Sequence, residues 1–130
     1  MIAAGLGCRR GTPVEELEAA LKQAQEKFGI ADADIAVFAT VDTKADEPGI
    51  AQLAELRGIP VQLYAKERLD EVTGLLSPSA RVRDLFGVAS VAEASALAAT
   101  GRNARLLGPR VATAMVTCAL AAGDGVEEGP

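Results

Sequence analysis

Histidine and tryptophan are absent from this chain of 130 residues, tyrosine occurs once and phenylalanine three times. Without histidine, Ser-His-Asp and Cys-His catalysis and imidazole ligation of a metal are excluded within the chain. So few aromatic rings leave little for stacking on nucleic-acid bases. The two cysteines, Cys8 and Cys118, stand far apart without a CxxC pair. The sequence therefore predicts neither a disulfide framework nor a zinc site.

Positive charge is also in short supply, because 13 Lys and Arg face 18 Asp and Glu, for a net charge of −5. Nucleic-acid affinity depends on basic side chains that neutralise phosphates, so no nucleic-acid partner is predicted. The apolar runs are too short to span a bilayer, and no basic leader with a long apolar stretch opens the chain. These observations predict a soluble, cytoplasmic protein without a membrane partner.

Apolar residues make up 49% of the chain, which is enough for a core in a protein the size of one domain. Periodicity and length predict buried strands at residues 1–7, 35–40 and 59–64, and helices at 13–28 and 48–57. Strands joined by helices in this way form parallel units with right-handed crossovers. The first half of the chain therefore predicts the parallel part of a sheet.

The second half has a weaker pattern. Its predicted elements are a helix at 66–72, a loop at 74–79, helical turns at 80–86, a helix ending at Thr100, and an antiparallel pair of strands at 106–107 and 111–120. The expected fold is a three-layer α/β/α domain over residues 1–122, with a mixed, mostly parallel sheet and a C-terminal antiparallel strand pair. Residues 123–130 are acidic and glycine-rich, which predicts a flexible tail.

Two polar loops follow the first two predicted strands. They read GLGCRRGT from Gly5 to Thr12 and TVDTKADEPG from Thr40 to Gly49. In an open α/β sheet ligands bind beyond the carboxyl ends of the strands, so both loops are predicted to open onto one crevice. The glycines miss the GxGxxG spacing by one place and no acidic residue ends the second strand. A nicotinamide or flavin cofactor is therefore not predicted.

The first loop has the chemistry of an anion site. The helix that follows it presents unpaired amide N–H groups, and Arg9 and Arg10 add two full charges. Gly7 and Gly11 would allow close approach of the backbone to a carboxylate or phosphate. The alternative is that the glycines only turn the chain and the arginines face water. Cys8 is a candidate nucleophile beside these charges, but without a histidine base a wall position is favoured.

Both predicted helix starts in these regions carry capping signatures. Thr12, with Glu15 three residues later, predicts a capping box for the first helix, and Ser90 with Glu93 predicts another for the late helix.

The second loop packs two types of charge into six residues, with Asp42, Lys44, Asp46 and Glu47 before Pro48. Asp46 or Glu47 can cap the helix that begins at the proline. Asp42 or Glu47 is also a candidate general base, and Lys44 can hold a carboxylate or an oxyanion. A magnesium site is an alternative that we rank low without a substrate phosphate, so no metal is predicted.

These two loops and the segment GVASVAEASAL from Gly87 to Leu97 resemble, in the same order, motifs of the CobE family, which is similar to the C-terminal domain of CbiG. The resemblance covers the chain from residue 5 to about residue 120. The matching residues are Gly7, Cys8, Arg9, Arg10, Gly11 and Thr12 in the first motif, Asp42, Lys44, Asp46, Glu47 and Pro48 in the second, and Ser90, Val91, Glu93 and Ala94 in the third. Arg110 departs from the family's lysine but keeps its charge.

The resemblance implies a role in cobalamin biosynthesis, and the short chain implies the oxygen-dependent branch. The implied ligand is a precorrin or hydrogenobyrinic-acid-type tetrapyrrole, whose acetate and propionate arms suit basic side chains. The first hypothesis is binding of this ligand without a cofactor. The candidate binding residues are Gly7, Cys8, Arg9, Arg10, Gly11, Thr12, Asp42, Lys44, Asp46 and Ser90.

Two further hypotheses follow from the same resemblance. CbiG is associated with opening a precorrin lactone and releasing acetaldehyde, so the second hypothesis is a precorrin hydrolase with Asp42, Lys44 or Glu47 as catalytic groups. The third is docking to another cobalamin-pathway enzyme through the alanine-rich helix that starts near Ser90. The small side chains of that helix also suit close packing on the sheet.

Overall fold

The computed structural model describes residues 1–44, 46–74 and 88–125. The elements in chain order are β1 (Ile2–Cys8), α1 (Val14–Phe28), η1 (Asp32–Asp34), β2 (Ile35–Val41), η2 (Asp42–Lys44), α2 (Pro48–Arg57), β3 (Val61–Tyr64), α3 (Lys66–Gly74), α5 (Val88–Thr100), β4 (Arg105–Leu106), β5 (Val111–Ala112) and β6 (Val116–Ala122). Within these residues, no helix combines the length and the apolar character needed to cross a membrane.

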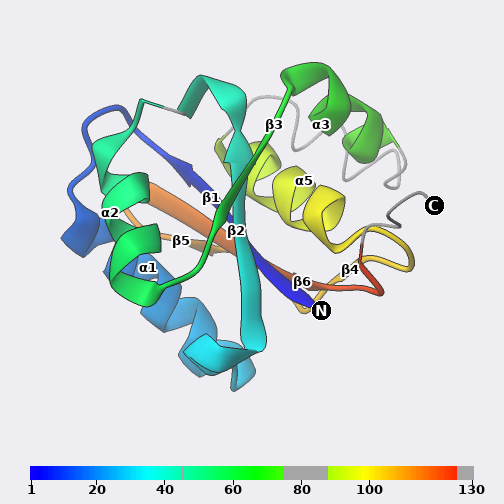
Figure 1. Ribbon diagram of the computed structural model, residues 1–130, viewed down its shortest axis with the longest axis horizontal. Helices are drawn as coiled ribbons and strands as arrows, with labels where there is room; N and C mark the ends of the chain where they lie inside the picture. Colours follow the sequence, from blue (N-terminus) through cyan, green and yellow to red (C-terminus); the bar gives the residue numbers. More distant parts are fainter. Residues whose placement is uncertain (45, 75–87, 126–130) are drawn as a thin grey trace.

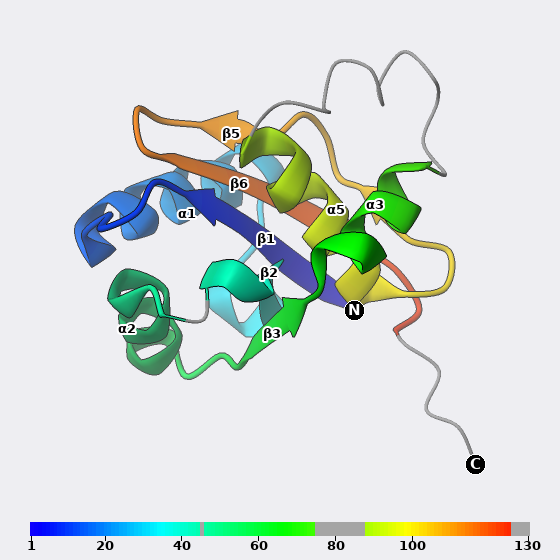
Figure 2. The ribbon, with the colours of Figure 1, turned by 90° about the horizontal axis from the view of Figure 1, so that it is seen from above.

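A single mixed sheet forms the middle layer, with strand order β3-β2-β1-β6-β4 and with β5 paired to β6. Strands β1, β2 and β3 run parallel, whereas β6 is antiparallel to β1, β4 and β5. Helices α1 and α2 cover one face of the sheet, and α3 and α5 cover the other (Figures 1 and 2). The predicted three-layer α/β/α class is therefore confirmed.

The larger core lies under α1 and α2. The predicted stripe of α1 places Leu17 and Leu21 against Leu6 of β1 and Phe38 of β2, and all four side chains are fully buried. Each such side chain stabilises the fold by about 1.5–3 kcal/mol through removal of apolar surface from water. This packing fixes α1 along the strands whose ends carry the polar loops.

The opposite face is packed with small residues. Residues 92–100 of α5 are all buried. A Cβ atom on Gly5 would overlap the carbonyl oxygen of Ala92, so glycine in β1 lets the helix backbone approach the sheet. The alanine-rich segment is thus used for close packing on the sheet. The prediction of an exposed docking helix is wrong for residues 92–100, because the sheet and α3 cover them.

Both predicted capping boxes are wrong. The N-cap of α1 is Pro13 and no side chain caps it, because the Thr12 hydroxyl instead donates to the carbonyl of Arg9 at 2.6 Å. Helix α5 begins at Val88, two residues before Ser90, so the serine lies inside the first turn.

The predicted strand at 111–120 is also divided. Its first two residues form β5, residues 113–115 form a turn, and the remainder from Val116 belongs to β6, which pairs back on β5. The turn between them is closed by Thr113, whose N–H donates to the Val116 carbonyl at 2.8 Å and whose hydroxyl accepts from the Val116 N–H at 3.1 Å. The antiparallel pairing of β4 with β6 agrees with the prediction.

Some predictions fall partly outside the described residues. Of the predicted loop at 74–79 and helical turns at 80–86, only Gly74 is described, as the last residue of α3. Of the predicted tail, residues 126–130 are not described. Gly123 donates to the Met1 carbonyl at 3.0 Å, and Gly125 donates to the Thr100 carbonyl at 2.8 Å. The domain boundary at residue 122 stays a prediction.

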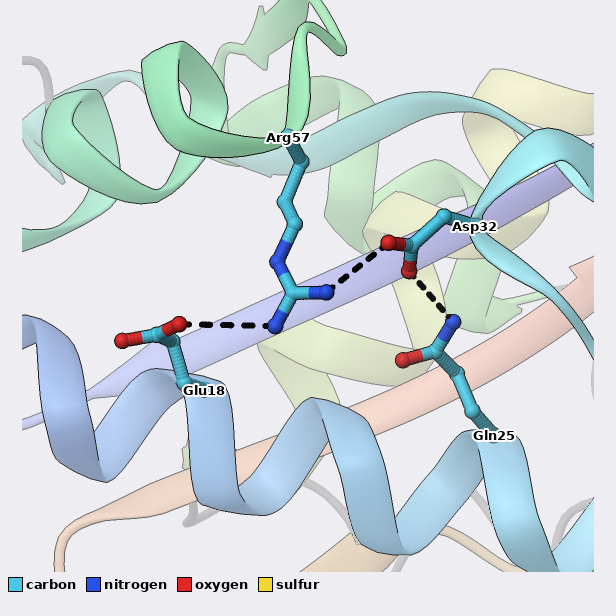
Figure 3. A network of polar contacts seen from close by, with 4 residues as sticks. All are labelled: Glu18, Gln25, Asp32 and Arg57. Carbon is cyan, nitrogen blue, oxygen red and sulfur yellow. Dashed lines mark hydrogen bonds and ion pairs between the residues drawn. The ribbon is translucent and has the colours of Figure 1, made fainter.

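A polar network joins the C-terminal end of α2 to α1 and η1 (Figure 3). Arg57 donates to Asp32 at 2.8 Å and to Glu18 at 3.4 Å, and Gln25 donates to Asp32 at 2.7 Å. The hydrogen bonds from Gln25 and Arg57 lower the pKa of Asp32. This network anchors the end of α2 that is remote from the second polar loop.

Candidate functional site

The two polar loops meet at the carboxyl edge of the parallel strands. Strands β1 and β2 are neighbours, and they extend into the predicted loops as far as Cys8 and Val41, so the loops proper begin at the next residues. The N–H of Gly11 in the first loop donates to both carboxylate oxygens of Glu47 in the second, at 3.3 and 3.2 Å. We call residues 9–12, 42–44 and 46–47 together the rim. The contact brings the two loops together at one edge, and the crevice onto which they are predicted to open stays a prediction.

The start of α2 lies against the end of the first loop. A Cβ atom on Gly49 would stand 2.5 Å from the carbonyl oxygen of Thr12 and 3.0 Å from Cδ1 of Leu17. Real Cβ atoms essentially never come within 2.5 Å of another heavy atom, so the absence of a side chain at position 49 allows α2 to start this close to the first loop. Gly11 takes the left-handed φ of 77°, which also favours glycine.

The two arginines of the rim are exposed. The backbone N–H of Arg9 donates to the carbonyl of Met115, in the β5–β6 turn, at 3.1 Å, which brings a third segment to the rim. Among the residues that the structure describes, no hydrogen bond or ion pair involves the guanidinium of Arg9 or Arg10. Their charge is therefore available to an anionic ligand.

Cys8 lies beneath the rim with 2% of its surface exposed. Burial raises the pKa of its thiol, and this effect outweighs the lowering by nearby Lys44; Glu47 raises the pKa further and a hydrogen bond with Thr12 lowers it. A buried, protonated thiol is a poor nucleophile. Burial therefore counts against Cys8 as a nucleophile, and its place in the wall of a ligand site stays a prediction.

The acidic residues of the second loop divide into two kinds. Asp42 and Asp46 are exposed, and Lys44 is half-buried. Glu47 is only 7% exposed and occupies the N-cap position of α2, but its side chain makes no capping hydrogen bond. The expectation that its carboxylate caps α2 is wrong, because that carboxylate binds Gly11 instead. Across the described ranges, no group of three or more Cys, Asp or Glu side chains is arranged to hold a metal ion.

The late helix reaches the same edge from the opposite face of the sheet. Ala92 lies over Gly5 of β1 and Thr100 lies beside Gly123, so α5 starts near the carboxyl end of β1 and places Ser90 toward that end. Glu93 was predicted only as part of a capping box, but it is buried and pairs with Arg110 at 3.5 Å. An acidic residue inside a run of buried alanines was the available signal.

Comparisons with known proteins identify the family. Residues 2–121 match the family model described as cobalamin synthesis G C-terminus. Protein CobE from Sinorhizobium sp is 37% identical over 118 residues, which is 90% of this chain and 77% of that protein.

Two relatives are cobalt-precorrin-5A hydrolases. The one from Priestia megaterium is 25% identical over 103 residues, covering 79% of this chain and 27% of the hydrolase. The one from Salmonella typhimurium is 33% identical over 90 residues, covering 69% and 26%. This chain thus spans about a quarter of the length of these hydrolases.

Solved structures agree with this assignment. The crystal structure of CobE, from the cobalamin biosynthetic pathway, has a TM-score of 0.79 and 40% identity, covering 93% of this chain and 89% of that one. The cobalamin biosynthesis protein chiG from Agrobacterium tumefaciens str. C58 has a TM-score of 0.77 and 36% identity, covering 95% and 98%. The predicted resemblance is confirmed, and the chain belongs to the cobalamin synthesis G C-terminus family as a cobalamin biosynthesis protein.

Proposed function

We propose that this protein binds an anionic precorrin-type tetrapyrrole at the rim. The observation that carries the proposal is the contact between Gly11 and Glu47, because it brings the exposed arginines of the first loop and Lys44 of the second to one edge. Precorrins are macrocycles fringed with acetate and propionate arms. Several cations spaced along one edge suit several carboxylates spaced around one ring.

The exposed arginines of the first loop support the same ligand class. The rim holds three basic and three acidic side chains, and its first loop contains Arg9 and Arg10 without an acidic residue, so the positive charge is concentrated there. A hydrogen bond to a charged group contributes about 1.5–3 kcal/mol, and a guanidinium can hold a carboxylate with two such bonds. Cys8 and the glycines would form the floor and the close-approach points beneath these arms.

The direct experiment is a titration with hydrogenobyrinic acid, followed by its absorption spectrum. The test variant carries Arg9→Glu and Arg10→Glu. The control carries Lys22→Glu and Arg105→Glu, two exposed cations away from the rim, so both variants change net charge equally. We expect the test variant to bind at least about a hundredfold more weakly. No spectral change with the wild-type protein, or equal losses in both variants, would contradict the proposal.

A second candidate function is hydrolysis of a precorrin. It is favoured by two relatives that are cobalt-precorrin-5A hydrolases and by the acid and lysine groups of the second loop. Asp42, which is exposed, would act as the base and Lys44 would stabilise an oxyanion. Because this chain spans only about a quarter of those hydrolases, binding ranks first.

The hydrolase candidate has its own test. Purified protein is incubated with cobalt-precorrin-5A, and release of acetaldehyde is measured. Asp42→Asn should abolish turnover while leaving affinity for hydrogenobyrinic acid within a few-fold. Unchanged turnover in this variant would remove Asp42 from the mechanism, and the absence of turnover by the wild-type protein would count against the activity itself.

A further inference from the structure

We propose that Glu47 is a positioning residue that holds the first loop in its binding shape, and that it is not a general base. This inference rests on the proposed function. A general base must reach a proton on the substrate, but only 7% of Glu47 is exposed. Both of its carboxylate oxygens instead face the Gly11 N–H, at 3.3 and 3.2 Å.

The first loop depends on this contact at its centre. Its start is held by the Arg9 N–H, which donates to the Met115 carbonyl, and its end by Thr12, whose N–H and hydroxyl both donate to the Arg9 carbonyl, at 3.2 and 2.6 Å. These bonds close the turn around Arg10 and Gly11, and the Glu47 carboxylate binds the N–H that the turn presents. Between the start and the end of the loop lies exposed Gly11, whose φ of 77° is left-handed. A glycine that nothing holds adopts this conformation and many others. The Glu47 carboxylate selects this conformation, and with it the place of the preceding Arg10.

Because Glu47 is charged, the direction in which affinity changes when its carboxylate is removed tests the inference. A carboxylate beside a site for anions repels the ligand, so electrostatics alone predicts tighter binding when it is removed. A positioning role predicts weaker binding, because the loop must then be ordered by the ligand. The two readings therefore give opposite outcomes for the same variant.

The experiment measures affinity for hydrogenobyrinic acid in three variants of Glu47. Glu47→Gln keeps an acceptor of the same length without the charge, and should bind at least as tightly as the wild type. Glu47→Asp keeps the charge but is one methylene shorter, and Glu47→Ala has neither; both should bind about tenfold more weakly, equivalent to about 1.4 kcal/mol. A general base would give the reverse ranking in turnover, with Asp better than Gln.

The matched control is Glu15→Ala, which removes an exposed carboxylate from the first turn of α1, next to the same loop. It should bind as tightly as the wild type or slightly more tightly. Equal or tighter binding by Glu47→Ala would overturn the positioning role. A loss in Glu47→Gln as large as in Glu47→Ala would overturn it too.

Amide hydrogen exchange tests the inference without a ligand and with substitutions that change the core little. The Gly11 amide should exchange slowly in the wild type and in Glu47→Gln, and at least about tenfold faster in Glu47→Asp. Unprotected exchange in the wild type would overturn the inference even if Glu47→Ala failed to fold. A wild-type protein that protects the Gly11 amide but binds no tetrapyrrole would instead overturn the proposed function. In that case the contact between Glu47 and the first loop would stand, and the effect of Glu47 on ligand affinity would fall.

Discussion

Replacement of Gly49 by alanine tests whether the rim depends on close contact between α2 and the first loop. The new Cβ would lie 2.5 Å from the Thr12 carbonyl oxygen, and backbone cannot yield as a side-chain end does. The start of α2 must therefore retreat by roughly half an ångström or more before the contact reaches the 3.0 Å limit. The Gly11–Glu47 hydrogen bond is already 3.2–3.3 Å long, so this retreat should break it.

The magnitude follows from opposing terms. Overpacking costs about 1–3 kcal/mol, whereas alanine gains up to about 1 kcal/mol over glycine in a helix. We expect a net loss of about 1–2 kcal/mol in the free energy of unfolding, measured by urea denaturation. For a chain of 130 residues each kcal/mol corresponds to roughly 3–6 °C in Tm. Affinity for hydrogenobyrinic acid should fall about tenfold, as in the Glu47→Ala variant.

The control is Gly108→Ala. Its Cβ would also lie 2.5 Å from a neighbour, but that neighbour is Cε1 of the Phe28 ring, at the other end of α1. Because a ring can shift where backbone cannot, Gly108→Ala should lose less stability than Gly49→Ala, and it should keep its affinity. If Gly49→Ala were as stable as the wild type, or lost stability while binding normally, the argument that this contact sets the rim would be refuted.

Two further outcomes concern pH. Burial raises the pKa of Cys118 from 9.0 to about 12, so the folded state keeps a proton that the unfolded state loses between these values. The free energy of unfolding should fall by up to about 1.4 kcal/mol per pH unit above pH 9, and Cys118→Ala should flatten this slope in urea denaturation. Hydrogen bonds from Gln25 and Arg57 lower the pKa of Asp32 below its usual 3.8. The ionised Asp32 therefore stabilises the folded state above that pH, and this stabilisation is lost as the pH falls through the lowered pKa. Arg57→Met should therefore be less stable than the wild type at neutral pH and equal to it in acid; a constant difference at every pH would contradict this cause.

Periodicity was sufficient to predict the layers of this fold. Apolar runs and helical stripes located every strand of the parallel half, and the rule that parallel strands end at one edge predicted that the two loops meet. The β5–β6 turn escaped prediction because the residues around Thr113 contain no glycine or proline. A run rich in β-branched residues looks like one strand, and the hydrogen bonds between Thr113 and Val116 reveal the turn.

The partners within the rim could not be predicted from composition. Thr12 carries the signature of a cap, but a hydroxyl can donate as well as accept, and here it donates to Arg9. Asp46 and Glu47 are neighbours of the same charge, yet one is exposed and the other buried. The partner of Glu47 is a backbone N–H 36 residues earlier, and every residue except proline offers such a donor. No side-chain pattern in the sequence could mark that pair.

Helix α2 explains why the rim depends on contacts far from its own loops. It has ten residues, which is too short for an isolated helix to be stable in water. It buries only Gly49, Ile50 and Leu53, so contacts at its ends contribute a large share of its placement. One end is tied to α1 through Arg57, and the other carries Glu47. Helix α1 begins directly after the first loop, and α2 begins directly after the second. The distance between the two loops is therefore determined by the packing of α1 against α2. A change that moves α2 should also move Lys44 relative to the arginines.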